Sequence, residues 1–133
     1  MQISLILNTL ENWAPLEWQE PYDNAGLIVG NPEQNCTGVL CSLDCTEAVV
    51  EEAISRGCNL IVSHHPIIFK GIKQINSNHF VSKVLVKAIQ NNIVLYAIHT
   101  NLDNLLEGVN KTLADRLHLE NRRILTPKPG FKD

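Results

Sequence analysis

Two histidine-containing segments each follow a short apolar stretch of the kind that forms a buried strand. The stretch NLIVS leads directly into His64 and His65, and the stretch IVLYAI leads into His99 and, four residues later, Asp103. In open α/β sheets, ligands bind beyond the carboxyl ends of the strands. The sequence therefore predicts that these imidazoles and this carboxylate share one edge of a sheet.

The His64-His65 doublet favours a site for two metal ions over a site for one. Adjacent residues of a continuing strand point to opposite faces, but Pro66 lacks a ladder amide and indicates that the strand ends here. Each imidazole can then serve a different ion of a close pair. The Asp103 carboxylate can bridge two cations about 3.5 to 4 Å apart, an arrangement that lowers the pKa of a water held between them.

A structural role is the competing interpretation for each of these residues. A single histidine after a strand is usually a hydrogen-bonded structural residue. The doublet, a third histidine and an aspartate at one edge favour a metal site instead. His79 and His118 lack such company, and we predict that they are surface residues.

Two further aspartates have alternative interpretations. Asp23-Asn24 precedes Gly26 and is typical of a turn, because both side chains hydrogen-bond their own backbone. Asp44 ends an apolar stretch and is either a cap for the next helix or a partner for a metal-bound histidine. Of these two roles for Asp44, we favour the cap.

The elements that must position these residues alternate along the chain. Four apolar stretches bounded by Gly, Asn and Pro predict buried strands, at residues 25–30, 38–43, 59–63 and 93–98. Amphipathic segments predict helices at the amino terminus, after an N-cap at Thr46, from Phe80 to Ile89, and from Glu107 to His118, the last burying Val109, Leu113 and Leu117. This alternation predicts an α/β fold: a mostly parallel sheet with helices on both faces.

Length and composition indicate one ordinary globular domain. The chain has 133 residues, 44% of them hydrophobic and 19% charged, with a net charge of −3. Lys70, Lys73 and Lys83 are too sparse for a nucleic-acid-binding patch. We predict a metal-site domain over residues 1–125. Residues 126–133, TPKPGFKD, have no periodicity and read as a linker-like tail.

The cysteines and the first residues indicate a cytoplasmic protein. Cys36, Cys41, Cys45 and Cys58 form neither C-x-x-C pairs nor a dense disulfide pattern, so we expect reduced, mostly buried thiols. A metal or redox pair of Cys41 and Cys45 is the alternative. Polar residues interrupt the first apolar segment, unlike a signal peptide, and no stretch reaches the roughly 18 to 20 apolar residues of a membrane span.

Three segments together resemble the Nif-three-like family, many of whose bacterial members are labelled GTP cyclohydrolase 1 type 2 homologues. They are DNAGL at residues 23–27, NLIVSHHP at residues 59–66 and HTNLD at residues 99–103. The resemblance extends in order over nearly the whole chain. It implies an α/β fold, a homo-oligomer that is a hexameric ring in many members, and a dinuclear metal centre.

The resemblance also implies roles for single residues. His64, His65 and Asp103 would be metal ligands, and His99 would lie near the metals, either to support the ligands or to move protons. The family's other ligands come from a carboxyl-terminal H-x-x-x-E motif that this sequence does not contain, and its members are roughly twice as long or longer. We therefore expect the two divalent ions, Zn, Mn or Fe, to be held loosely.

Two functions follow from these expectations. The first is metal-dependent hydrolysis, in which a metal-activated water attacks a ring carbon, an amide or a phosphate ester of a small molecule. No P-loop or G-x-G-x-x-G motif supports a specific nucleotide. The alternative is a non-enzymatic metal-binding protein that acts as a regulator or a scaffold.

Overall fold

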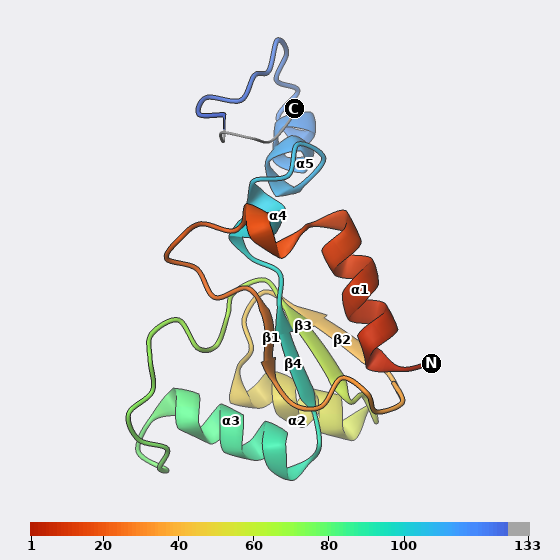
Figure 1. The fold of residues 1–133 in the computed structure, drawn as a ribbon, viewed down its shortest axis with the longest axis vertical. Coiled ribbons are helices and arrows are strands. Elements are labelled where there is room, and N and C mark those ends of the chain that lie inside the picture. The colour runs from red at the N-terminus through yellow and green to blue at the C-terminus, as the bar shows by residue number, and fades with distance from the viewer. Residues whose placement is uncertain (128–133) are drawn as a thin grey trace.

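A four-stranded sheet lies at the centre of the structure, a computed structural model that describes residues 1–127 (Figure 1). Positions 128–133 of the predicted tail lie outside the described residues. The strands are β1 (Gly26–Val29), β2 (Val39–Ser42), β3 (Leu60–Ser63) and β4 (Val94–Ala97). The helices are α1 (Ile3–Trp13), the short 3-10 helix η1 (Leu16–Trp18), α2 (Glu47–Ser55), α3 (Phe80–Gln90), α4 (Thr100–Asp103) and α5 (Val109–Arg116).

The sheet is mostly parallel, as predicted, with one antiparallel strand. Its order is β1-β4-β3-β2; β2, β3 and β4 run parallel, and β1 runs antiparallel to β4. Gly30, just after β1, has a φ of +103°, and a Cβ there would lie 2.9 Å from Val94 Cγ2. Glycine therefore lets the chain leave β1 while it remains close against β4.

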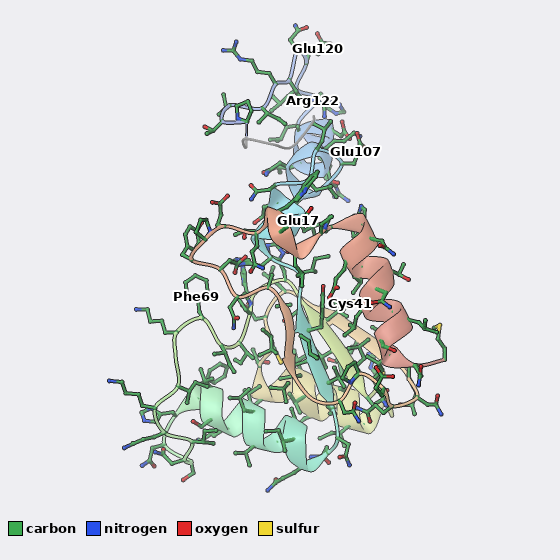
Figure 2. All side chains as sticks on the ribbon, viewed as in Figure 1. Glu17, Cys41, Phe69, Glu107, Glu120 and Arg122 are labelled. Carbon is green, nitrogen blue, oxygen red and sulfur yellow. The ribbon has the colours of Figure 1, made fainter. Side chains whose placement is uncertain are left out.

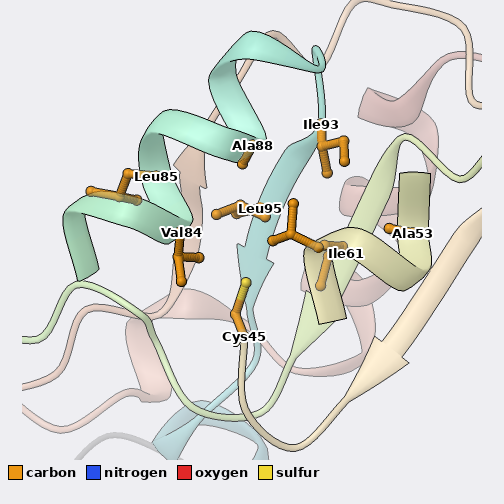
Figure 3. Packing of buried hydrophobic residues seen from close by; sticks show 9 residues of the cluster. Cys45, Ala53, Ile61, Val84, Leu85, Ala88, Ile93 and Leu95 are labelled. Carbon is orange, nitrogen blue, oxygen red and sulfur yellow. The ribbon is translucent and has the colours of Figure 1, made fainter. Parts of the chain in front are cut away.

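Hydrophobic cores lie on both faces of the sheet, because successive strand residues point to opposite sides. Ile61 and Leu95 face α2 and α3, where they pack with Val50, Ala53 and Val84 (Figure 3). The alternate strand positions face α1 and pack with its buried residues, in a second cluster of Ile3, Leu7, Ala14, Leu60, Val62, Val94, Tyr96 and Ile98. The helices thus cover both faces, as the sequence predicted.

The helix boundaries follow from local capping. The Thr46 side chain accepts a hydrogen bond from the Val49 amide and caps α2, as predicted. The helix ends at Arg56-Gly57, and Gly57 takes a positive φ of +68°. The helix predicted from Phe80 to Ile89 is α3, and the amino-terminal apolar stripe forms α1.

The predicted burial of the last helix is wrong. Helix α5 forms, but Val109, Leu113 and Leu117 are exposed, because α5 projects beyond α4 and away from the sheet (Figure 1). The apolar residues recur at helical spacing, as predicted, but among the described residues no strand packs against α5.

The four cysteines are free thiols, as predicted, but only Cys45 is fully buried. Cys36 and Cys58 are partly buried, and Cys41 is exposed because its strand, β2, lies at the edge of the sheet. Within residues 1–127, no helix combines the length and hydrophobicity that a membrane span requires.

Candidate metal centre

Three histidines meet at the carboxyl edge of the two central strands. His64 and His65 follow β3 and His99 follows β4, and these parallel neighbours end at the same edge. The ring centroids are 5.0 Å apart for His64 and His65, 5.3 Å for His64 and His99, and 5.5 Å for His65 and His99. One potential ligand nitrogen from each ring lies within 4.8 Å of the other two. Their spacing is suited to a shared ion.

Asp103 reaches the same site from helix α4. The backbone amide of Asp103 donates to the His99 carbonyl at 3.1 Å, and its Oδ1 lies 3.7 Å from Nε2 of His64. All four residues singled out in the sequence therefore lie together. The three nitrogens make the tightest group, with the carboxylate beside His64.

The Nδ1 atom of His64 is held by the backbone. It lies 2.9 Å from the carbonyl oxygen of Ile98, and a carbonyl can only accept, so Nδ1 carries the proton. In the neutral ring, the lone pair is then on Nε2, the atom that faces Asp103. The hydrogen bond fixes both the tautomer and the orientation of the ring.

Asp44 holds His65 in the corresponding way. Its Oδ1 lies 2.8 Å from Nδ1 of His65, and it follows β2, which ends at the same edge as β3. The favoured interpretation of Asp44 as a helix cap is wrong, because the side chain of Thr46 occupies that position. The structure supports the other alternative, a partner for one of the clustered histidines.

Asp23 holds the third histidine. Its Oδ1 lies 2.8 Å from Nδ1 of His99, and its carboxylate is fully buried. Its other oxygen, Oδ2, accepts hydrogen bonds from the Thr100 amide, at 3.0 Å, and from the Thr100 hydroxyl. The amide of Asn24 also donates to Oδ1.

These hydrogen bonds set the charge of Asp23. Burial of the carboxyl acts to raise its pKa, but the hydrogen bonds from Thr100, His99 and the Asn24 amide outweigh burial and lower the pKa below its ordinary value. Asp23 is therefore an ionised acceptor. A carboxylate in this state orients the His99 ring with its Nδ1 proton toward Asp23.

The sequence indicated a turn at Asp23 and missed this contact. The reason is the direction of β1: because β1 is antiparallel to β4, its first residue, Gly26, pairs with Ala97 near the end of β4. The loop before β1 consequently lies at the carboxyl edge of the central strands. An acidic residue just before an apolar strand was the available signal, but strand direction cannot be read from that pattern.

The HTNLD segment is tied to the amino-terminal part of the chain by its two middle polar residues. Asn101 is fully buried; its Oδ1 accepts from the His99 amide and its Nδ2 donates to the Ala14 carbonyl at 2.8 Å. The Thr100 hydroxyl oxygen accepts from the Glu20 amide at 2.8 Å. His99 and Asp103 thus sit on a backbone that is fixed on both sides.

The donor set fits a divalent metal ion. Each of the three imidazoles has its Nδ1 against an oxygen of the protein, which leaves Nε2 as the free coordinating atom. Metal-binding histidines commonly show this pattern of carboxylate or carbonyl support. Asp103 adds an oxygen donor.

The fold and the site define a mixed α/β protein with a histidine cluster able to hold a metal at the carboxyl edge of its sheet. The chain belongs to the Duf34/NIF3 (NGG1p interacting factor 3) family, whose model matches residues 1–131. This confirms the family resemblance seen in the three sequence segments.

Similar proteins and solved structures support this family assignment. A GTP cyclohydrolase 1 type 2 homolog of Staphylococcus epidermidis is 48% identical over 131 residues, which are 98% of this chain and 36% of the relative. A Bacillus cereus protein related to NIF3 has a TM-score of 0.91 at 38% identity, over 96% of this chain and 36% of that one. Reduced HcgD from Methanocaldococcus jannaschii has a TM-score of 0.84 at 32% identity, over 91% and 48%. The chain thus spans about a third to a half of the length of these proteins.

Proposed function

We propose that residues 1–125 form the metal-site domain of a metal-dependent hydrolase. The observation that carries this proposal is the shared support of the three imidazoles, each with Nδ1 held by an oxygen of the protein beside a common centre. Because the rings are already oriented, little free energy is lost in ordering them when a metal ion binds. A bound divalent pair would supply a water acidic enough to ionise near neutral pH.

In this proposal His64, His65 and Asp103 hold the metal pair, and His99 moves protons beside it. The Asp23 carboxylate keeps the His99 Nδ1 proton in place, so Nε2 is the atom that accepts a proton from the attacking water. His99 is also close enough to the other two rings to be a ligand itself. The remaining donors would come from other polypeptide, in the longer relatives' second part or in a homo-oligomer, and the ions held by this chain alone would be weakly bound.

Metal titration of the chelator-stripped chain tests the site. Calorimetry with Zn²⁺ and Mn²⁺ should give weak, reversible binding, which the His64→Ala/His65→Ala double variant loses. The matched control is His79→Ala/His118→Ala, since both of these histidines are exposed and lie outside the cluster. Unchanged binding in the first variant, or equal loss in the control, would refute the site.

Two more measurements separate the possible roles. If His99→Ala abolishes metal binding, His99 is a ligand; if it leaves binding intact but stops turnover, it moves protons. Turnover is measured with metal over nucleotides, phosphoesters and cyclic amides. Metal binding without turnover of any of these would support the alternative of a non-enzymatic regulator or scaffold.

A further inference from the structure

Two aromatic side chains with exposed rings lie beside the histidine cluster. The ring of Phe69 lies 6.3 Å from the ring of His99, at an interplanar angle of 85°, and the ring of Tyr22 lies 6.3 Å from that of Phe69, at 58°. Phe69 is 47% exposed and Tyr22 is 65% exposed. The site therefore has an aromatic surface of two adjoining rings next to a polar, metal-competent centre.

The loops that carry these rings are fixed to each other and to the cluster. Asn24 Nδ2 donates to the Ile68 carbonyl at 2.7 Å, and this bond joins the loop before β1 to the loop after β3. Tyr22 precedes Asp23, whose buried carboxylate contacts His99. Figure 2 shows Phe69 on the segment between β3 and α3. The rings are exposed, but their backbone is held in place.

Phe69 also lies at the margin of a hollow in the surface. The loop after β3 and the start of α3 form the walls of a solvent-open pocket of about 600 Å³, lined in part by Phe69, Ile67, Lys70 and Val81. This volume is within the range of small-molecule sites, about 300 to 1,000 Å³. Phe69 thus lines this pocket and also contacts the ring of His99.

We propose that Phe69 and Tyr22 form a stacking surface for a flat heteroaromatic ring of the substrate. Aromatic side chains bind flat rings of many kinds through their π faces, whereas a non-planar sugar or an aliphatic chain has no π face of its own to stack on them. A ring placed on Phe69 would lie next to His99 and the cluster, where a ring carbon or its substituent would meet the activated water. This inference rests on the proposed function and names its substrate class as planar heteroaromatic compounds.

Saturation-transfer NMR on the full 133-residue chain tests the surface, with adenosine and guanosine as flat probes and ribose as the non-planar one. Base protons of both nucleosides should receive saturation, and ribose should not. Phe69→Leu and Tyr22→Leu keep an apolar side chain but remove the π face, so each should weaken nucleoside binding about fivefold or more. The matched control is Phe80→Leu, an exposed phenylalanine at the start of α3 that should leave binding unchanged.

The outcomes separate this inference from the proposed function. Nucleoside binding that is absent, or equally strong in Phe69→Leu and Tyr22→Leu, overturns the stacking surface, even if the metal titration succeeds. Conversely, nucleoside binding that both variants weaken supports the stacking surface, even if the His64→Ala/His65→Ala metal test fails. Because both rings are exposed, thermal unfolding of the two variants should match that of the wild type.

Discussion

The Nδ1 atom of His99 lies 2.8 Å from Oδ1 of Asp23, a residue 76 positions earlier in the chain. The side chain of Asp23 is fully buried, and the Thr100 amide and hydroxyl also donate to its carboxylate. One carboxylate therefore joins the loop before β1 to the end of β4. This relationship makes Asp23 both a structural link and the residue that orients one imidazole of the candidate metal centre.

We predict that Asp23→Asn destabilises the chain by about 1–3 kcal/mol, because an amide cannot accept all the hydrogen bonds that the carboxylate accepts. Urea unfolding of the metal-free protein measures this change. Metal affinity should fall about tenfold or more if the misoriented His99 ring is a ligand, and should stay unchanged if His99 only moves protons. The control is Asp115→Asn, which removes only exposed ion pairs and should stay within about 0.5 kcal/mol of the wild type.

The contribution of Asp23 to the free energy of unfolding should decrease at acid pH. Its folded pKa is lowered from 3.8, so its stabilising effect is complete above that value and is lost as pH falls through the folded pKa. The stability gap between wild type and Asp23→Asn should thus narrow as the pH falls below 3.8. A gap that stays unchanged or widens below pH 3.8 would contradict the assignment.

Gly108→Ala should disturb the segment that carries Asp103. A Cβ at Gly108 would lie 2.2 Å from the Leu102 carbonyl oxygen and 2.9 Å from that of Leu105, so the backbone must move. We expect a loss of about 1–3 kcal/mol in urea unfolding, with weaker metal binding. Gly71→Ala is the control: a Cβ there meets nothing within 4 Å, and stability should be unchanged or slightly raised.

The exposed apolar face of α5 should contribute little to the stability of this chain. Leu113→Gln is expected to change the free energy of unfolding by under about 0.5 kcal/mol, because Leu113 is exposed. Leu85→Gln, on the buried face of α3, should cost about 3 kcal/mol or more. Comparable losses in the two variants would mean that α5 packs against the domain in solution.

The thiols should differ sharply in reactivity. Burial raises the pKa of Cys45 to about 11, so its thiol is protonated at pH 8 as well as shielded from reagent. Iodoacetamide at pH 8, followed by peptide mass spectrometry, should label exposed Cys41 rapidly and leave Cys45 unmodified until urea is added. Rapid labelling of Cys45 in the native protein would contradict its place in the core.

The sequence predicted the parts of the site that follow parallel strands and missed the part that does not. His64, His65 and His99 were placed correctly, because the carboxyl ends of parallel neighbours must share an edge. Asp23 was missed since an apolar stretch does not reveal that its strand is antiparallel. Helix α5 has the periodicity of a packed helix, but periodicity cannot reveal whether a partner surface is present.

The position of β4 in the sheet has a consequence for biosynthesis. Of the four strands in residues 1–127, β4 leaves the ribosome after the other three, yet it lies between β1 and β3. Until about residue 97 has emerged, β1 has no strand to pair with and β3 has one unpaired edge. The nascent chain must therefore keep these apolar strands from aggregating until β4 arrives, and the insertion of β4 would join these four strands and assemble the histidine cluster in one step.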